Sequence, residues 1–89
     1  MPLTESQRNQ IASYKIQIER YRQDLQHLKD DKKKKSEYYA NAIKGTKDPN
    51  SKRSYRQSKI SAVNTLVNQM ESKKREIERL KENIASIKK

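Results

Sequence analysis

The side chains best able to do chemistry in this sequence are one histidine and a large set of lysines and arginines. His27 is the only histidine, and Asp24 and Asp30 lie about one helical turn on either side of it. A metal ion there needs further ligands, and the chain has no cysteine to supply one. We therefore predict that His27 lies on the surface of a basic helix. We expect a protein without catalytic residues, cofactor, metal or small-molecule substrate.

The basic residues predict a different kind of chemistry, the binding of an anionic partner. The net charge is +11, and residues 29–59 carry eleven basic against four acidic side chains. Such a region attracts nucleic acid, anionic lipid, cell-wall polymer or an acidic protein surface, and charge alone does not choose among them. The candidate contact residues form a predicted basic tip: Lys32, Lys33, Lys34, Lys35, Lys52, Arg53 and Arg56.

Two series of apolar residues predict the elements that carry these charges. Both have steps of three and four residues, the pattern of helices that bury a narrow seam against another helix. The first series is Ile11, Tyr14, Ile18, Tyr21, Leu25, Leu28, and then Tyr39 and Ala42. The second is Val63, Leu66, Met70, Ile77, Leu80, Ile84 and Ile87. The fold class is therefore all-α, an antiparallel two-helix hairpin in a single domain of residues 1–89.

Turn and capping residues set the expected boundaries: a helix over 5–44, a turn over 45–49 and a helix over 50–88. Thr4 and Gln7 have the spacing of a capping box. Gly45 suits the left-handed position that follows a helix. Asp48 with Pro49 suits the start of the next helix, and Ser51 is an alternative cap.

Folding the chain at this turn pairs positions whose numbers sum to about 95. Ile18 then meets Ile77, and Leu25 meets Met70. Lysines interrupt the seam: Lys32 and Lys35 continue the first series, and Lys73 interrupts the second. In this register Lys32 lies opposite Val63, and Lys35 lies opposite Ile60. Because lysines face these two apolar residues, they remain poorly covered within the hairpin.

Several apolar residues lie beside the seam, among them Ile16 on the first helix. Three others are the candidate apolar contacts to a partner: Ile43, Ile60 and Val67. A single seam barely offsets the entropy lost in ordering a chain of this length. We therefore expect the hairpin to complete a four-helix bundle with its own copy or with another helical protein.

The sequence has no run of apolar residues long enough to span a bilayer. Its beginning, MPLTESQRNQ, lacks the apolar core of a signal peptide. We expect a cytoplasmic protein, or one exported without a cleaved signal peptide.

The turn sequence Ile43-Lys44-Gly45, between helices of nearly equal length, resembles the Trp-x-Gly turn of the small helical-hairpin proteins of ESX or type VII secretion, with Ile in place of Trp. The helical arms are also similar to the small partner proteins of LXG toxins in Gram-positive bacteria. This resemblance implies a partner or targeting chaperone that forms a helical bundle with a secretion substrate.

Two alternatives stay open. Asp48-Pro49-Asn50 resembles the turn of type III secretion needle subunits, although a charge of +11 resists close packing of identical copies. The basic residues also fit a nucleic-acid-binding or nucleoid- or plasmid-associated coiled-coil protein, which would bind mostly phosphate and depend strongly on salt.

Overall fold

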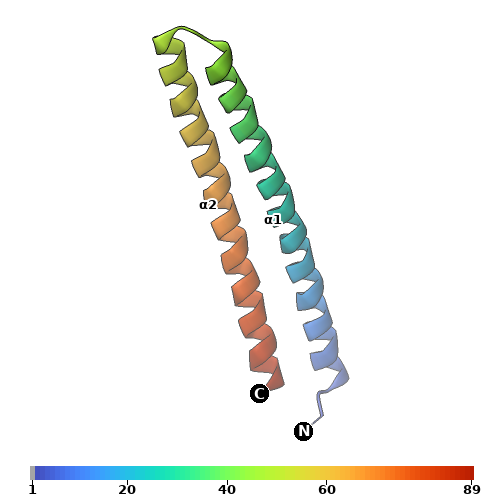
Figure 1. Cartoon of the computed structure of the whole chain (residues 1–89). Coiled ribbons are helices and arrows are strands. Elements are labelled where there is room, and N and C mark those ends of the chain that lie inside the picture. The colour runs from blue at the N-terminus through green and yellow to red at the C-terminus, as the bar shows by residue number, and fades with distance from the viewer. Residues whose placement is uncertain (1) are drawn as a thin grey trace.

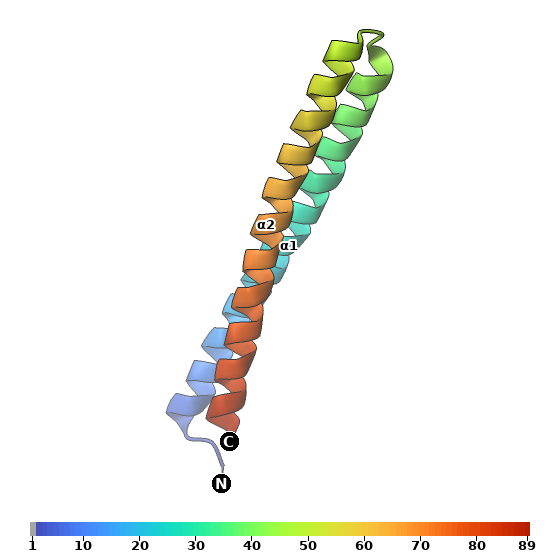
Figure 2. The same ribbon diagram turned by 90° about the vertical axis from the view of Figure 1, so that its left-hand side faces the viewer.

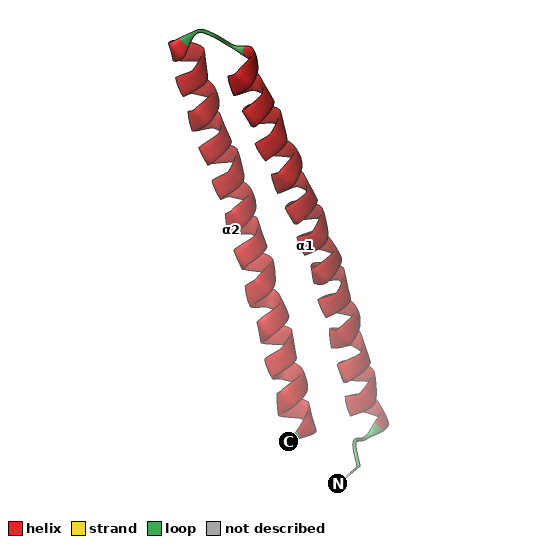
Figure 3. Ribbon diagram, in the orientation of Figure 1, coloured by secondary structure: helices red, strands yellow, loops and turns green. Residues whose placement is uncertain are grey.

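The computed structural model describes residues 2–89 as two long antiparallel helices, α1 (Glu5–Gly45) and α2 (Pro49–Lys88). Figure 1 shows the helices side by side, with both termini at the end opposite the turn. Figure 2 shows that they cross along their length, and Figure 3 shows how short the loop between them is. The hairpin measures 69 × 15 × 12 Å, so it is a rod with one seam and no other layer. The predicted fold class is confirmed for the hairpin itself.

The start of each helix has the predicted cap. The Thr4 backbone N–H donates to Gln7 Oε1 over 2.9 Å, and the Gln7 backbone N–H donates to Thr4 Oγ1 over 3.1 Å. Asp48 caps α2, since the Asn50 backbone N–H donates to its Oδ1 over 3.1 Å. Ser51, the alternative cap, instead donates its hydroxyl to Asp48 Oδ2.

The turn is shorter than the sequence predicts, because Gly45 and Pro49 belong to the helices and the loop is only 46–48. The left-handed conformation expected at Gly45 is wrong, since no residue of the described part of the chain has a positive φ. Thr46 is extended, with φ −110° and ψ 143°, and its Oγ1 accepts from the Asp48 backbone N–H. The chain therefore leaves α1 through extended residues, which need no glycine.

This correction predicts that Gly45→Ala stabilises the protein. Gly45 is helical, and a Cβ added there meets no neighbouring heavy atom within 4 Å. Alanine should raise the free energy of unfolding by about 0.5 kcal/mol, because it loses less backbone entropy in a helix than glycine does. Urea unfolding followed by circular dichroism measures this change. Asp48→Ala serves as the opposite control and should lower stability by about 1 kcal/mol. A loss of stability in Gly45→Ala would contradict the helical assignment.

The core is the predicted seam. Within residues 2–89 six side chains are buried, and all of them belong to the two predicted series: Ile11, Ile18, Leu66, Met70, Ile77 and Leu80. Ile18, Ile77 and Leu80 form its central cluster, against which Tyr14, Tyr21, Leu25 and Ile84 pack. This cluster confirms the predicted antiparallel register.

The seam departs from the prediction in the half nearer the turn. Lys32 is half-buried as expected, but Lys35 is exposed and Ser36 takes the next inward position. The inward positions in α1 therefore step by four residues twice, at Leu28, Lys32 and Ser36. In α2, Ala62 and Val63 are both half-buried before Leu66 and Met70, so its inward positions keep the predicted steps of three and four. Two successive steps of four locally unwind a coiled coil. The face that α1 turns toward α2 therefore changes near the turn.

None of the helices in residues 2–89 has a stretch long and apolar enough to cross a membrane.

Candidate partner-binding groove

The structure places an apolar groove between the helices, in the half of the hairpin near the turn. Its volume is about 470 Å³. The lining residues are Ser36 and Ile43 from α1, and Arg56, Lys59, Ile60, Val63 and Asn64 from α2. We call this the turn-end groove. It brings together two of the three predicted apolar contact residues, Ile43 and Ile60, and one residue of the predicted basic tip, Arg56.

Ile60 is the most exposed apolar side chain of this groove. It is 60% exposed, whereas Ile43 and Val63 are half-buried. The reason lies in the shifted seam, because Ser36 is too short to cover an isoleucine on the facing helix. Val67, the third predicted residue, does not line the groove but lies two helical turns further along the same side of α2, where it is half-buried. An isoleucine left uncovered beside other apolar side chains is a feature typical of an interaction surface.

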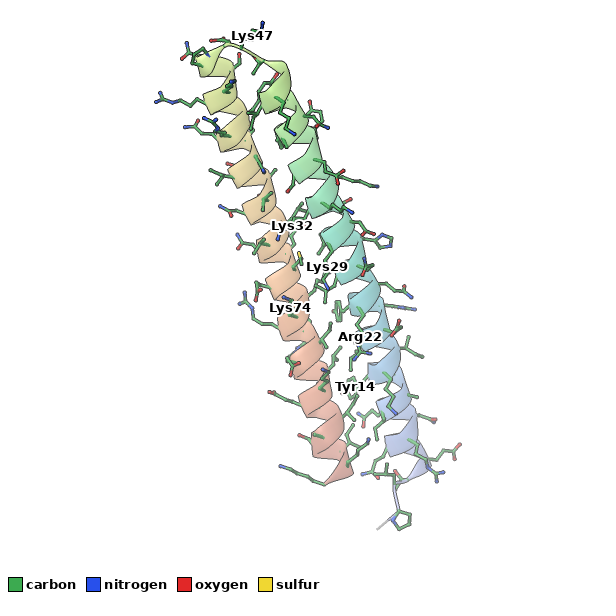
Figure 4. All side chains as sticks on the ribbon, viewed as in Figure 1. Tyr14, Arg22, Lys29, Lys32, Lys47 and Lys74 are labelled. Carbon is green, nitrogen blue, oxygen red and sulfur yellow. The ribbon has the colours of Figure 1, made fainter. Side chains whose placement is uncertain are left out.

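The predicted basic tip is not one cluster. Lys52, Arg53 and Arg56 occupy the first two turns of α2, whereas Lys32 to Lys35 begin thirteen residues before the end of α1, about 20 Å from the turn. Figure 4 shows this separation, with Lys32 far along α1 from Lys47 at the turn. Lys33 and Lys34 face outward beside Asp30 and Glu37, which line the same shallow depression.

A second set of basic residues, which the sequence analysis did not identify, lies on the same side of the hairpin as the groove, toward the termini. In both helices a basic side chain recurs every seven residues, immediately after a seam position such as Tyr14, Tyr21, Leu28, Leu80 or Ile87. We call this the basic stripe: Arg8, Lys15, Arg22 and Lys29 on α1, and Lys74, Lys81 and Lys88 on α2. All seven side chains are exposed.

Both helices contribute their part of the stripe to the same side of the hairpin. Arg8 and Lys15 of α1 line one depression of about 300 Å³ together with Lys88 of α2. Continuing the seven-residue steps toward the turn leads to Ser36 and Ile43 on α1, and to Val67 and Ile60 on α2. Figure 4 shows Arg22 and Lys29 along the space between the helices, with Lys74 on α2 across from them. This side of the hairpin therefore carries the turn-end groove near the turn, where Arg56 and Lys59 join its apolar residues, and the exposed basic stripe toward the termini.

Some charges of the stripe have carboxylate neighbours on their own helix. Arg22 lies 3.9 Å from Glu19, Lys74 lies 3.7 Å from Glu71, and Lys81 lies 3.4 Å from Glu78. Glu71 pairs with Lys74, three residues further along α2. Exposed pairs of this kind contribute little stability, so their cations stay available to a partner. Within residues 2–89, no carboxylate lies within 4 Å of the charged groups of Arg8, Lys15, Lys29 and Lys88.

The opposite side of the seam has a different character. Lys73 reaches from α2 to Asp24 of α1, with 3.5 Å between Nζ and Oδ2, and its ammonium lies 5.2 Å from the centre of the Tyr21 ring. A lysine therefore interrupts the seam without leaving a buried, unpaired charge. His27 is exposed beside it, and residues 2–89 contain no group of three or more side chains that could hold a metal ion.

Comparison with protein-family models, with curated proteins and with solved structures finds no match to this chain.

Proposed function

We propose that this protein is a non-enzymatic interaction protein whose turn-end groove receives a helix from another protein. The observation that carries the proposal is the position of Ile60. This side chain is 60% exposed in a groove that also contains Ile43 and Val63. Covering it removes apolar surface from water, which favours association.

The shape of the surface favours a helix as the occupant. The groove runs along the axis of two antiparallel helices, and its apolar residues lie on helices at intervals that another helix can match. A helix laid there would pack against both arms of the hairpin, as in a helical bundle. The single seam of six buried side chains supplies little stability of its own, so such a partner would also stabilise the fold.

The resemblance of the turn and arms to type VII hairpin proteins suggests the class of partner. In this form of the proposal, the occupant is a helical region of a secretion substrate, and the hairpin is its targeting partner. The cytoplasm, with export alongside the substrate, is the corresponding location.

Nucleic-acid binding is the second candidate function. The exposed basic residues favour it, together with the net charge of +11. Binding of this kind rests on phosphate contacts, so its affinity should fall steeply with added salt.

A photo-crosslinking amino acid at position 60 tests the proposal in the native cell, with position 16 as a matched control. Both positions hold isoleucine, and their exposures are nearly equal, 60% and 57%. We expect a specific protein adduct from position 60 and little from position 16, because only Ile60 lies in the groove.

The adduct should then be identified and its partner produced with the hairpin. Ile60→Asp should weaken that complex at least about tenfold, since it places a carboxylate against apolar surface. Equal crosslinking from both positions, or adducts only with nucleic acid, would contradict the proposal.

A further inference from the structure

The side of the hairpin that contains the turn-end groove changes in composition along its length, and this change specifies what can lie on it. Near the turn the groove is lined by Ile43, Ile60 and Val63 together with Arg56 and Lys59, and toward the termini the same side carries the basic stripe. We propose that the occupant is an acidic amphipathic helix of a different protein, held in one direction. Its apolar half contacts the turn-end groove, and its other half presents Asp or Glu side chains to the basic stripe. This inference rests on the proposed function.

The spacing of the stripe is that of a helical partner. Its cations recur every seven residues, which separates them by about 10.5 Å along each helix. Acidic side chains placed every seven residues on a third helix repeat at the same distance, so each can meet a cation. Charges at positions flanking an apolar seam commonly decide which helices pair and in which direction.

A second copy of this chain does not fit the same surface. If two copies joined these faces with their turns at one end, the two basic stripes would face each other. If they joined with their turns at opposite ends, the stripe of each copy would cover the apolar groove of the other. The lysines of the stripe would then lose their contact with water. Charge complementarity therefore favours a different, acidic chain.

The carboxylates beside the stripe disfavour nucleic acid on this side. Glu19, Glu71 and Glu78 lie within 4 Å of three of its cations and would repel phosphates. A duplex presents phosphates about every 3.4 Å along each strand, so a repeat of seven residues between cations gives it no advantage over any other spacing. An acidic helix can instead turn apolar or uncharged side chains toward those glutamates.

The combined extent of the turn-end groove and the basic stripe sets the length of the partner helix. From Arg8 to Ile43, α1 advances about 50 Å, so an occupant of about 36 helical residues spans both parts. The direct test uses synthetic peptides of this length and the full-length hairpin. One peptide carries leucines at seam spacing in one half and glutamates every seven residues in the other. A second has lysines in place of those glutamates, and a third has the same composition as the first with the glutamates at irregular spacing.

Fluorescence anisotropy measures the binding of the labelled peptides. We expect the regular glutamate peptide to bind at least about tenfold more tightly than either control peptide, because several exposed ion pairs of modest strength act together. Raising the salt concentration should reduce this preference without abolishing binding, since the apolar half does not depend on charge.

Charge reversal on the hairpin gives the matched comparison. Lys15→Glu with Lys29→Glu removes two stripe cations that have no carboxylate within 4 Å. Arg20→Glu with Arg75→Glu makes the same change in net charge at exposed positions two residues after the seam, which point away from the groove. We expect the first pair to reduce the preference for the glutamate peptide over the lysine peptide severalfold, since five stripe cations remain, and the second pair to keep it. Circular dichroism of both variants confirms that the hairpin is still helical.

The outcomes separate this inference from the proposed function. Ile60→Asp should abolish binding of the regular glutamate peptide. If it does, but glutamate and lysine peptides bind wild-type protein equally, the helix-docking function holds and the acidic partner is wrong. If Ile60→Asp leaves binding unchanged, or no peptide binds, helix docking in this groove is wrong as well.

Loss of the preference for the glutamate peptide in both double variants alike would show that net charge, rather than the stripe, sets this preference. Competition by a short DNA duplex as effective as that by the peptide would overturn the inference in favour of nucleic acid.

Discussion

Ile18→Asp is expected to unfold the isolated protein. Ile18 is 6% exposed and lies in the central cluster with Ile77 and Leu80. The substitution loses the apolar burial of the isoleucine and places a carboxylate without a partner in the seam. Together these effects cost more than about 4 kcal/mol. Small domains have a free energy of unfolding of about 5 kcal/mol or more, and this hairpin buries only one narrow seam, so a loss of this size removes most of its stability. Circular dichroism should show loss of most of the helical signal at room temperature.

The control for this experiment lies two residues away on the same helix. Ile16 is 57% exposed, so Ile16→Asp makes the same chemical change on the surface and should shift the melting temperature by only a few degrees. Ile77→Asp should behave like Ile18→Asp, since its side chain belongs to the same cluster. If Ile16→Asp and Ile18→Asp lost equal helicity, the face assigned to the seam would be wrong.

Leu80→Ala is expected to have the second largest effect. Leu80 is the most buried core residue, at 3% exposure, and it packs in the central cluster with Ile18 and Ile77. Truncation removes buried methyl groups and leaves a cavity that long, straight helices cannot easily close. We expect the free energy of unfolding to fall by about 3 kcal/mol. Chemical unfolding followed by circular dichroism measures the loss.

Leu25→Ala provides a graded comparison with the same change in chemistry. Leu25 packs against the same cluster but is half-buried, so water fills part of the space that its truncation leaves. Its loss should be about half that of Leu80→Ala. A larger loss for Leu25→Ala would mean that the seam is centred differently from the arrangement described above.

The seam and the register could be predicted from the sequence because they depend on periodicity alone. Once Ile11 to Leu28 and Val63 to Ile87 are recognised as apolar series, one antiparallel arrangement aligns them. The caps at Thr4 and Asp48 were equally predictable, because a side chain that satisfies a backbone donor at a helix start acts over only two or three residues.

The remaining features depend on how the two helices fit each other. Lys35 continues a strict seven-residue pattern, and only the two steps of four residues in α1, from Leu28 through Lys32, turn Ser36 inward instead. Gly45 is the only glycine, and this suggested a left-handed residue that the extended loop does not need. The basic stripe was detectable in principle, since its seven-residue spacing is present in the sequence. A sum of charge over a segment of the chain does not reveal the stripe, because its cations align only along one side of each helix.

The position of the central cluster also determines how this chain can fold. Ile18 and Ile77 are about sixty residues apart in sequence, whereas the segments beside the turn, which are close in sequence, meet through residues that are only half-buried, such as Lys32, Ser36 and Val63. A chain that closes progressively from the turn gains little until it reaches the far half of both arms. The entropy of closing a long loop must therefore be lost before the strongest contacts form. The hairpin should fold slowly for an all-helical protein, with a transition state that joins the two distant arms.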